Sequence, residues 1–94
     1  MENTEYSVYI LYCDDGSYYT GISTDVERRL KEHENSSRGA RYLRGRGPLK
    51  LVFSEVVGGR SKASSLEYRI KRLNRSEKKA LIDGVQSLQT LWTD

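Results

Sequence analysis

Two runs of strand-forming residues, separated by a short turn, set the first firm limit on the fold of this chain. Residues 6–13, YSVYILYC, are rich in tyrosine, valine and isoleucine, which favour β-strands. The sequence Asp14-Asp15-Gly16 that follows is a turn signal, because glycine adopts a positive φ without steric cost. Residues 17–23, SYYTGIS, provide the returning strand, so the pattern predicts a β-hairpin.

The length of the turn decides which residues share a face of the hairpin. A three-residue loop places Tyr9 opposite Gly21 and Leu11 opposite Tyr19, so both tyrosines lie on one face and the glycine leaves space opposite Tyr9. A two-residue loop would place the two tyrosines on opposite faces. We favour the three-residue loop, in which Gly16 closes a type I turn with a bulge.

The segment after the hairpin has the pattern of an amphipathic helix. Residues 24–27, TDVE, match a capping box, which predicts a helix that starts at about Asp25 and ends near residues 34–35. On a helical wheel, Arg29 and His33 fall on the same stripe as the apolar residues of this helix. These two polar side chains are therefore expected to be neighbours, one turn apart, on the inward face.

A long basic loop separates this helix from a third strand. Residues 36–48 have no regular period and contain three glycines, one proline and four arginines. Loops of this length are often functional. Residues 49–57, LKLVFSEVV, predict the third strand, which Gly58 and Gly59 end.

Two more helices are expected in the second half of the chain. Ser61 is expected to cap a helix over about residues 62–73, with Glu67 on its inward face among apolar residues. Ser76 is expected to cap a third, shorter helix that stops at Gly84.

Length and composition indicate one soluble domain. The chain has 94 residues, of which 36% are hydrophobic and 31% charged, and its single cysteine, Cys13, excludes an intramolecular disulfide. No apolar run could span a membrane and the acidic N-terminus is unlike a signal peptide, so we expect a cytoplasmic protein without a membrane partner. We assign residues 1–84 to one domain. Residues 85–94 form a tail that either packs on the domain or offers an apolar face to a protein partner.

The distribution of charge points to a polyanionic partner. All 16 lysines and arginines lie between Arg28 and Lys79, where they outnumber the acidic residues by 11. Basic charge that is clustered and interleaved with tyrosine and glycine favours a nucleic acid over the alternative of a merely solvated surface. We expect DNA, with RNA as the alternative. The candidate contact residues are Arg28, Arg38, Arg41, Tyr42, Arg44, Arg46, Lys62, Arg69 and Arg72.

The polar side chains expected to point inward form a candidate catalytic set. They are Tyr9, Tyr19, Arg29, His33 and Glu67. Burying an unpaired charge is costly, so a small domain that directs such groups inward is expected to use them. Hydrolysis of a phosphodiester needs a proton acceptor for the nucleophile, positive charge near the phosphate, and an acid or a metal at the leaving oxygen.

Glu67 and Arg29 are the charged members of this set. Glu67 is a hard oxygen ligand suited to Mg²⁺ or Mn²⁺, and one carboxylate suffices for a single-metal site. Arg29 has the planar fork that binds phosphate oxygens. The alternatives are a structural ion pair between the two residues, or an arginine stem that packs along the apolar stripe.

The two tyrosines and the histidine are the candidates for proton transfer. His33 can give or take a proton near neutral pH, although a lone histidine on an apolar face is more often a core residue. A phenol with an ordinary pKa of about 10 is a poor base unless cations lie close by, and Arg29 and a metal would supply them. Tyr9 and Tyr19 are also typical strand residues, so packing is the alternative role.

Other classes of site do not fit the sequence. There is no glycine-rich loop with a lysine between a strand and a helix, so a P-loop is excluded. One histidine and one cysteine cannot build a structural zinc site, and no Ser-His-Asp arrangement is suggested.

The order of the candidate residues resembles that of the GIY-YIG nuclease family. The triplets SVY, which ends at Tyr9, and YTG, which starts at Tyr19, match the two halves of the motif, with serine in place of glycine and threonine in place of isoleucine. Arg29, His33 and Glu67 follow in the family's order and approximate spacing. The resemblance covers about residues 6–82 and is greatest for small stand-alone bacterial members.

This resemblance implies an α+β fold, in which a three-stranded antiparallel sheet is flanked by three or more helices in the order ββαβαα. It also implies hydrolysis of DNA with a divalent metal on Glu67. By this analogy Tyr9 helps to remove a proton from the attacking water and Arg29 holds the scissile phosphate. Tyr19 and His33 would assist through hydrogen bonds.

The sequence therefore predicts a metal-dependent DNA endonuclease. Larger relatives in repair, restriction and intron homing carry extra domains that choose the target, and this chain matches the small members. We therefore expect weak sequence preference or selectivity for DNA structure, and a role in DNA repair or processing. The alternatives are a non-catalytic nucleic-acid-binding module and an accessory protein for a repair nuclease.

Overall fold

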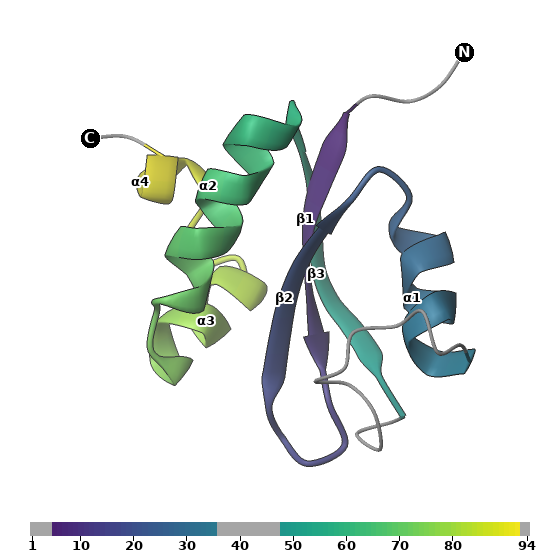
Figure 1. The fold of residues 1–94 in the computed structure, drawn as a ribbon. Coiled ribbons are helices and arrows are strands. Elements are labelled where there is room, and N and C mark those ends of the chain that lie inside the picture. The colour runs from purple at the N-terminus through teal and green to yellow at the C-terminus, as the bar shows by residue number, and fades with distance from the viewer. Residues whose placement is uncertain (1–4, 36–47, 93–94) are drawn as a thin grey trace.

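The computed structural model describes residues 5–35 and 48–92, which form three strands and four helices (Figure 1). In chain order these are β1 (Tyr6–Tyr12), β2 (Tyr18–Ser23), α1 (Val26–Asn35), β3 (Lys50–Gly58), α2 (Arg60–Lys71), α3 (Arg75–Ile82) and α4 (Gln89–Trp92). The bounds of β3 and α1 lie within one residue of the sequence prediction. The basic loop over residues 36–47, which includes five of the candidate contact residues, lies outside the described part of the chain.

The three strands form one antiparallel sheet in the order β2-β1-β3. Helix α1 covers one face of this sheet, and α2, α3 and α4 lie on the opposite face (Figure 1). The predicted α+β fold with a three-stranded antiparallel sheet flanked by helices is thus confirmed. Because β1 is central, β2 and β3 are the edge strands.

The hairpin has the register that the three-residue loop predicts. Tyr9 lies opposite Gly21 and Leu11 lies opposite Tyr19. Gly16 has a φ of 86°, and its backbone N–H donates to the carbonyl of Cys13 at 2.9 Å, which closes the turn. Successive side chains on a strand alternate between faces, so this register places Tyr9 and Tyr19 together.

The alternation divides the core into two clusters, one on each face of the sheet. The cluster near α1 contains Tyr9, Leu11, Cys13 and Leu49, with Tyr19, Val26 and Leu30 packed against it. The cluster near α2 and α3 contains Val8, Ile10, Ala63, Leu66, Ile70, Leu81 and Leu88. Helix α1 therefore packs on the face that carries the two tyrosines.

The residues that cap the helices differ from the sequence prediction. Asp25, not Thr24, caps α1, because its Oδ1 accepts from the backbone N–H of Arg28 at 3.1 Å. Helix α2 begins two residues earlier than expected, and Gly59 rather than Ser61 occupies its N-cap position in extended conformation. Strand β3 ends at Gly58 and α2 begins at Arg60, so only Gly59 separates them.

Helix α3 is capped by Asn74 and not by Ser76. The side chain of Asn74 accepts from the backbone N–H of Glu77 at 2.8 Å, and the Glu77 carboxylate accepts from the backbone N–H of Asn74 at 3.0 Å. This reciprocal pair is a capping box. Gly84, with a φ of 79°, follows the helix as predicted.

The C-terminal segment packs back on the domain. Leu88 is buried in the cluster near α2, and Leu91 packs against that cluster. Arg69 of α2, one of the candidate contact residues, donates from its guanidinium to the carbonyl of Leu91. Val85 is 82% exposed and does not join the core, because the segment from Val85 to Leu88 does not continue the helix. Within the ranges described, no helix combines the length and the apolar character needed to cross a membrane.

The capping box of α3 predicts unequal effects for two neighbouring substitutions. Asn74→Ala removes the side-chain acceptor and is expected to lower the free energy of unfolding by about 1 kcal/mol. Ser76→Ala is the matched control, since Ser76 is exposed and follows the cap, and it should change stability by less than about 0.5 kcal/mol. Urea unfolding followed by circular dichroism measures both. Equal losses in the two variants would contradict this assignment of the cap.

Candidate active site

The candidate site is built around the phenol of Tyr9, whose ring lies over Gly21 of the neighbouring strand. A Cβ atom added to Gly21 would lie 2.6 Å from the Tyr9 hydroxyl oxygen and 2.7 Å from Cζ, distances that no real side chain tolerates. The φ of Gly21 is not positive, so this position needs glycine for space rather than for backbone conformation. The absent side chain lets the phenol lie across β2, as the sequence predicted.

Helix α1 brings His33 and Arg29 to this phenol. The Tyr9 hydroxyl and His33 Nε2 are 2.9 Å apart, within hydrogen-bonding distance and buried. Arg29 lies one turn earlier on the same helix and donates a hydrogen bond to Tyr9. The ring of Tyr19 meets the imidazole edge-on, with 5.4 Å between the ring centroids. Four of the five predicted catalytic side chains therefore form one cluster.

Burial keeps both partners of the Tyr9–His33 hydrogen bond neutral. Desolvation is the largest effect on Tyr9 and, with the nearby Tyr19, raises the pKa of its phenol to about 12, although Arg29 opposes the rise. Burial and the neighbouring Arg29 charge lower the pKa of His33 below its ordinary 6.5. Of the two cations that the sequence analysis expects beside the phenol, Arg29 lowers the pKa of Tyr9 as expected, and burial outweighs this effect.

The hydrogen bond between Tyr9 and His33 is compatible with either tautomer of the imidazole. The Tyr9 oxygen accepts from Arg29, and it can still donate to His33 Nε2 or accept a second hydrogen bond from it. A neutral imidazole that accepts at Nε2 carries its proton on Nδ1. That tautomer is the one that would let the phenol proton move onto the imidazole.

Glu67 acts on the cluster through its charge, from the other side of the sheet. It lies on α2, yet its negative charge raises the pKa of both Tyr9 and Tyr19, burial being the larger cause for each. Its carboxylate Oε2 lies 3.4 Å from the Lys71 ammonium, and its side chain is 25% exposed. The alternative of a structural ion pair with Arg29 does not describe Glu67, because Arg29 pairs with Glu32 at 3.0 Å.

The single carboxylate of Glu67 fits a magnesium or manganese site that is completed by water and substrate. The described residues contain no group of three or more His, Cys, Asp or Glu side chains that could hold an ion by themselves. Mg²⁺ commonly uses one or two carboxylates and fills its other positions with water and phosphate oxygens. A partly exposed carboxylate with a half-exposed lysine as its partner is compatible with such binding.

A cavity of about 310 Å³ lies beside the cluster, along β2. Tyr19 lines it, together with Tyr18, Thr20, Lys71 and Lys78. Sequence reasoning did not single out these two lysines. One signal was available for Lys71, which follows Glu67 at the i,i+4 spacing of a helical ion pair.

The predicted nucleic-acid contacts do not form one surface in the described part of the chain. Arg28 is exposed on α1, whereas Arg72 follows α2, donates to the Tyr68 hydroxyl at 3.1 Å and lies over its ring. Arg69 is engaged with the C-terminal segment. Arg38, Arg41, Tyr42, Arg44 and Arg46 lie outside the described residues, so their part in the interface stays a prediction.

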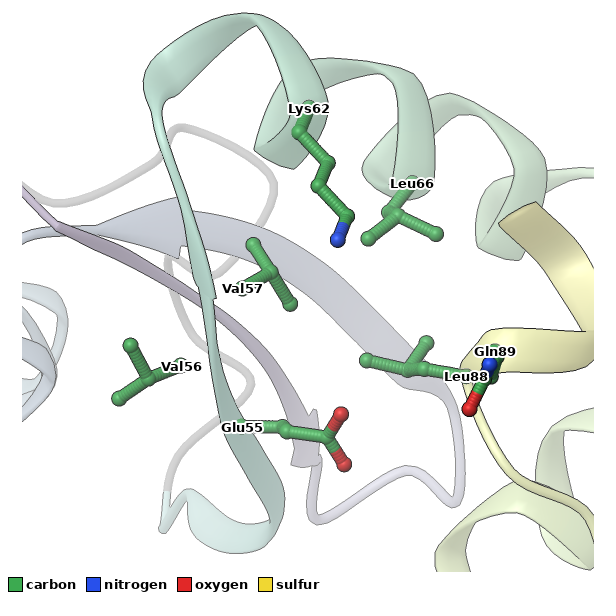
Figure 2. A pocket seen from close by; sticks show the side chains of 7 residues that line it. All are labelled: Glu55, Val56, Val57, Lys62, Leu66, Leu88 and Gln89. Carbon is green, nitrogen blue, oxygen red and sulfur yellow. The ribbon is translucent and has the colours of Figure 1, made fainter. Parts of the chain in front are cut away.

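Lys62, another predicted contact, lies at a different cavity of about 230 Å³ between β3, α2 and the segment before α4. Figure 2 shows its ammonium directed into this cavity, above Val57 and beside Leu66, with Glu55 at the far side. None of the five candidate catalytic residues lines this cavity. Lys62 is therefore separated from the candidate active site.

Two phenols, an imidazole and a guanidinium thus lie together, with the Glu67 carboxylate within electrostatic range, in a catalytic domain of the nuclease type. Residues 5–80 match the GIY-YIG catalytic domain, and the chain belongs to this family.

Related proteins and solved structures agree with this assignment. A UPF0213 protein of Photorhabdus laumondii is 46% identical over 82 residues, which are 87% of this chain and 78% of that protein. A UPF0213 protein of Halobacterium salinarum is 51% identical over 74 residues, which are 79% of this chain and 95% of that protein.

Two structures determined by solution NMR are also similar. A UPF0213 protein from Bacillus halodurans has a TM-score of 0.55 at 46% identity, with 84% of this chain and 83% of that chain covered. A protein from E. faecalis has a TM-score of 0.62 at 36% identity, with 90% of this chain and 91% of that chain covered.

The packing of Tyr9 on Gly21 predicts that even one methyl group at this position is harmful. Gly21→Ala should displace the phenol, weaken its hydrogen bond to His33 and lower the free energy of unfolding by about 1–3 kcal/mol. Gly59→Ser is the control: it has open space around it and serine is a favoured N-cap residue. Urea unfolding measures both, and NMR of the imidazole reports the contact. A fully stable Gly21→Ala variant with an unshifted imidazole would refute the packing.

The lowered pKa of His33 predicts a pH-dependent stability. As the pH falls below about 6.5, the unfolded chain takes up the proton before the folded chain does, so the free energy of unfolding should decrease. His33 is the only histidine, and His33→Asn should remove this dependence between about pH 7.5 and about pH 6. Urea unfolding at several pH values tests this. An equal decrease in the variant would show that another group is responsible.

Proposed function

We propose that this chain is a divalent-metal-dependent endonuclease that hydrolyses phosphodiester bonds in DNA. The observation that carries the proposal is the neutral Tyr9–His33 pair, with its hydrogen bond of 2.9 Å, beside Arg29 and within electrostatic range of Glu67. Membership of a nuclease-type family supports this chemistry. Each group matches one requirement of phosphodiester hydrolysis.

In the proposed reaction, Tyr9 and His33 take up the proton of the attacking water. The water proton passes to the phenol oxygen while the phenol proton passes to His33 Nε2, and the water oxygen forms its bond to phosphorus as the ester P–O bond breaks. A phenol with a pKa of about 12 is a weak acid, so a lone tyrosinate is costly at neutral pH. Transfer to His33 avoids that species, because the lowered pKa keeps the imidazole neutral and able to accept.

Arg29 and Glu67 provide the charges in this proposal. Arg29 has a side chain that is 31% exposed and already close to Tyr9, so its guanidinium can reach both a phosphate and the phenol oxygen. Glu67 would hold Mg²⁺ or Mn²⁺. A divalent metal bound there would stabilise negative charge on the phosphate and the leaving oxygen. Tyr19, half-buried against His33, would orient the imidazole.

The proposal extends to the setting of the reaction. We infer a cytoplasmic enzyme of DNA repair or processing with weak sequence preference or a preference for DNA structure, and RNA is the alternative substrate. The excess of basic residues in the central and later parts of the chain supports a polyanionic substrate.

A cleavage assay tests the proposed chemistry. Wild-type protein should cut supercoiled or branched DNA with Mg²⁺ or Mn²⁺ and lose this activity in EDTA. Glu67→Gln and Tyr9→Phe should each slow cutting by about 10²-fold or more and leave DNA binding intact. Glu55→Gln, an exposed carboxylate on β3, is the matched control and should cut normally.

Two outcomes would contradict the proposal. Unchanged cutting by Glu67→Gln would remove the metal-ligand role. If wild-type protein binds DNA but does not cut it with any divalent metal, the chain is a nucleic-acid-binding module rather than an enzyme.

A further inference from the structure

The cavity along β2 adjoins the candidate active site and is lined by two lysines. Tyr19 belongs to both, because it lines the cavity and its ring lies 5.4 Å from the imidazole of His33. Lys71 also belongs to both, since it lines the cavity and pairs with Glu67 at 3.4 Å. Among the residues that the structure describes, no acidic side chain lines the cavity. A ligand here would therefore touch groups that are next to the reacting centre.

The basic side chains near this cavity differ in their interaction partners. Lys79 pairs with Asp83 at 3.0 Å and Arg75 lies over the ring of Tyr18 at 4.7 Å while donating to the carbonyl of Gly16. Lys78 is different: it is half-buried at the cavity, and within the described ranges the structure records no acidic partner for its ammonium.

We propose that Lys71 and Lys78 hold a backbone phosphate of the nucleic-acid strand, adjacent to the phosphate that is cut. This proposal rests on the proposed function, which places the phosphate that is cut at the candidate active site. The cavity adjoins that site along the edge strand β2. This contact would help to orient the nucleic-acid strand along the edge of the sheet, where α1 lies on one face and α2 and α3 lie on the other.

The chemistry of the lining favours a phosphodiester over other ligands. Lysine ammonium groups are compact point charges that bind phosphate oxygens, and partial burial strengthens the attraction. The phenols of Tyr18 and Tyr19 can donate further hydrogen bonds. The volume of about 310 Å³ suits a phosphate with part of its sugar.

Binding to a short single-stranded DNA oligonucleotide in EDTA tests this inference without cleavage. Fluorescence anisotropy over a range of salt concentrations is measured for wild type, Lys78→Gln and Lys79→Gln. Lys78→Gln should weaken binding several-fold and reduce the slope of log affinity against log salt by about 0.7 to 1. Lys79→Gln is the matched control on the next residue, and it should behave as wild type because its ammonium is paired with Asp83. Circular dichroism confirms that each variant is folded.

Lys71→Gln, alone and combined with Lys78→Gln, extends the series, and the slope should fall by a similar amount again in the double variant. Equal losses in Lys78→Gln and Lys79→Gln would show only a general effect of charge and would overturn the proposal. A Lys78→Gln variant that binds the oligonucleotide as wild type does would also overturn it. Binding is measured in EDTA, so the binding assay does not depend on cleavage. If wild type does not cut DNA, the proposed enzymatic activity is wrong, but the binding assay still tests the roles of Lys71 and Lys78.

Discussion

The close approach of the Tyr9 ring to the backbone of Gly21 sets the position of every other group in the candidate site. With no Cβ on the opposite strand, the phenol lies across β2 and reaches His33 at 2.9 Å on the helix that covers this face. Arg29 and Tyr19 then surround the same hydroxyl and imidazole. A side chain at position 21 would push the phenol away and separate the pair that the proposed proton transfer needs.

Burial and the charge of Arg29 act in opposite directions on the pKa of Tyr9, where burial is the stronger, and in the same direction on that of His33. Burial raises the pKa of Tyr9 and lowers that of His33, so both are neutral near pH 7 even though Arg29 favours the phenolate. If the phenol gives its proton to the imidazole while it takes one from water, no tyrosinate forms and the positive charge appears on His33. Glu67 and Lys71 are more exposed than this pair, so ions and phosphates can reach them.

The register of the hairpin and the inward-facing residues of the helices were predictable, because both depend on interactions between residues close together in the sequence. Loop length and the alternation of side chains determine the register that pairs Tyr9 with Gly21, and helical periodicity places Arg29 and His33 one turn apart. The same periodicity placed Glu67 on the inner side of α2. The helix caps were less predictable, since Asn74 and Ser76 are both good caps within one turn and the path of the chain decides between them.

The sequence by itself therefore determined the strands, their pairing in the hairpin and the types of side chain that face inward. Only the tertiary structure decided that Glu67 approaches the tyrosines from the opposite face of the sheet, that Arg69 is bound by the C-terminal segment, and that Lys78 lines a cavity beside Tyr19. It also decided that burial outweighs Arg29 at Tyr9. These features depend on which distant segments meet and on how much water they exclude, and neither quantity is encoded in the spacing of residues along one strand or helix.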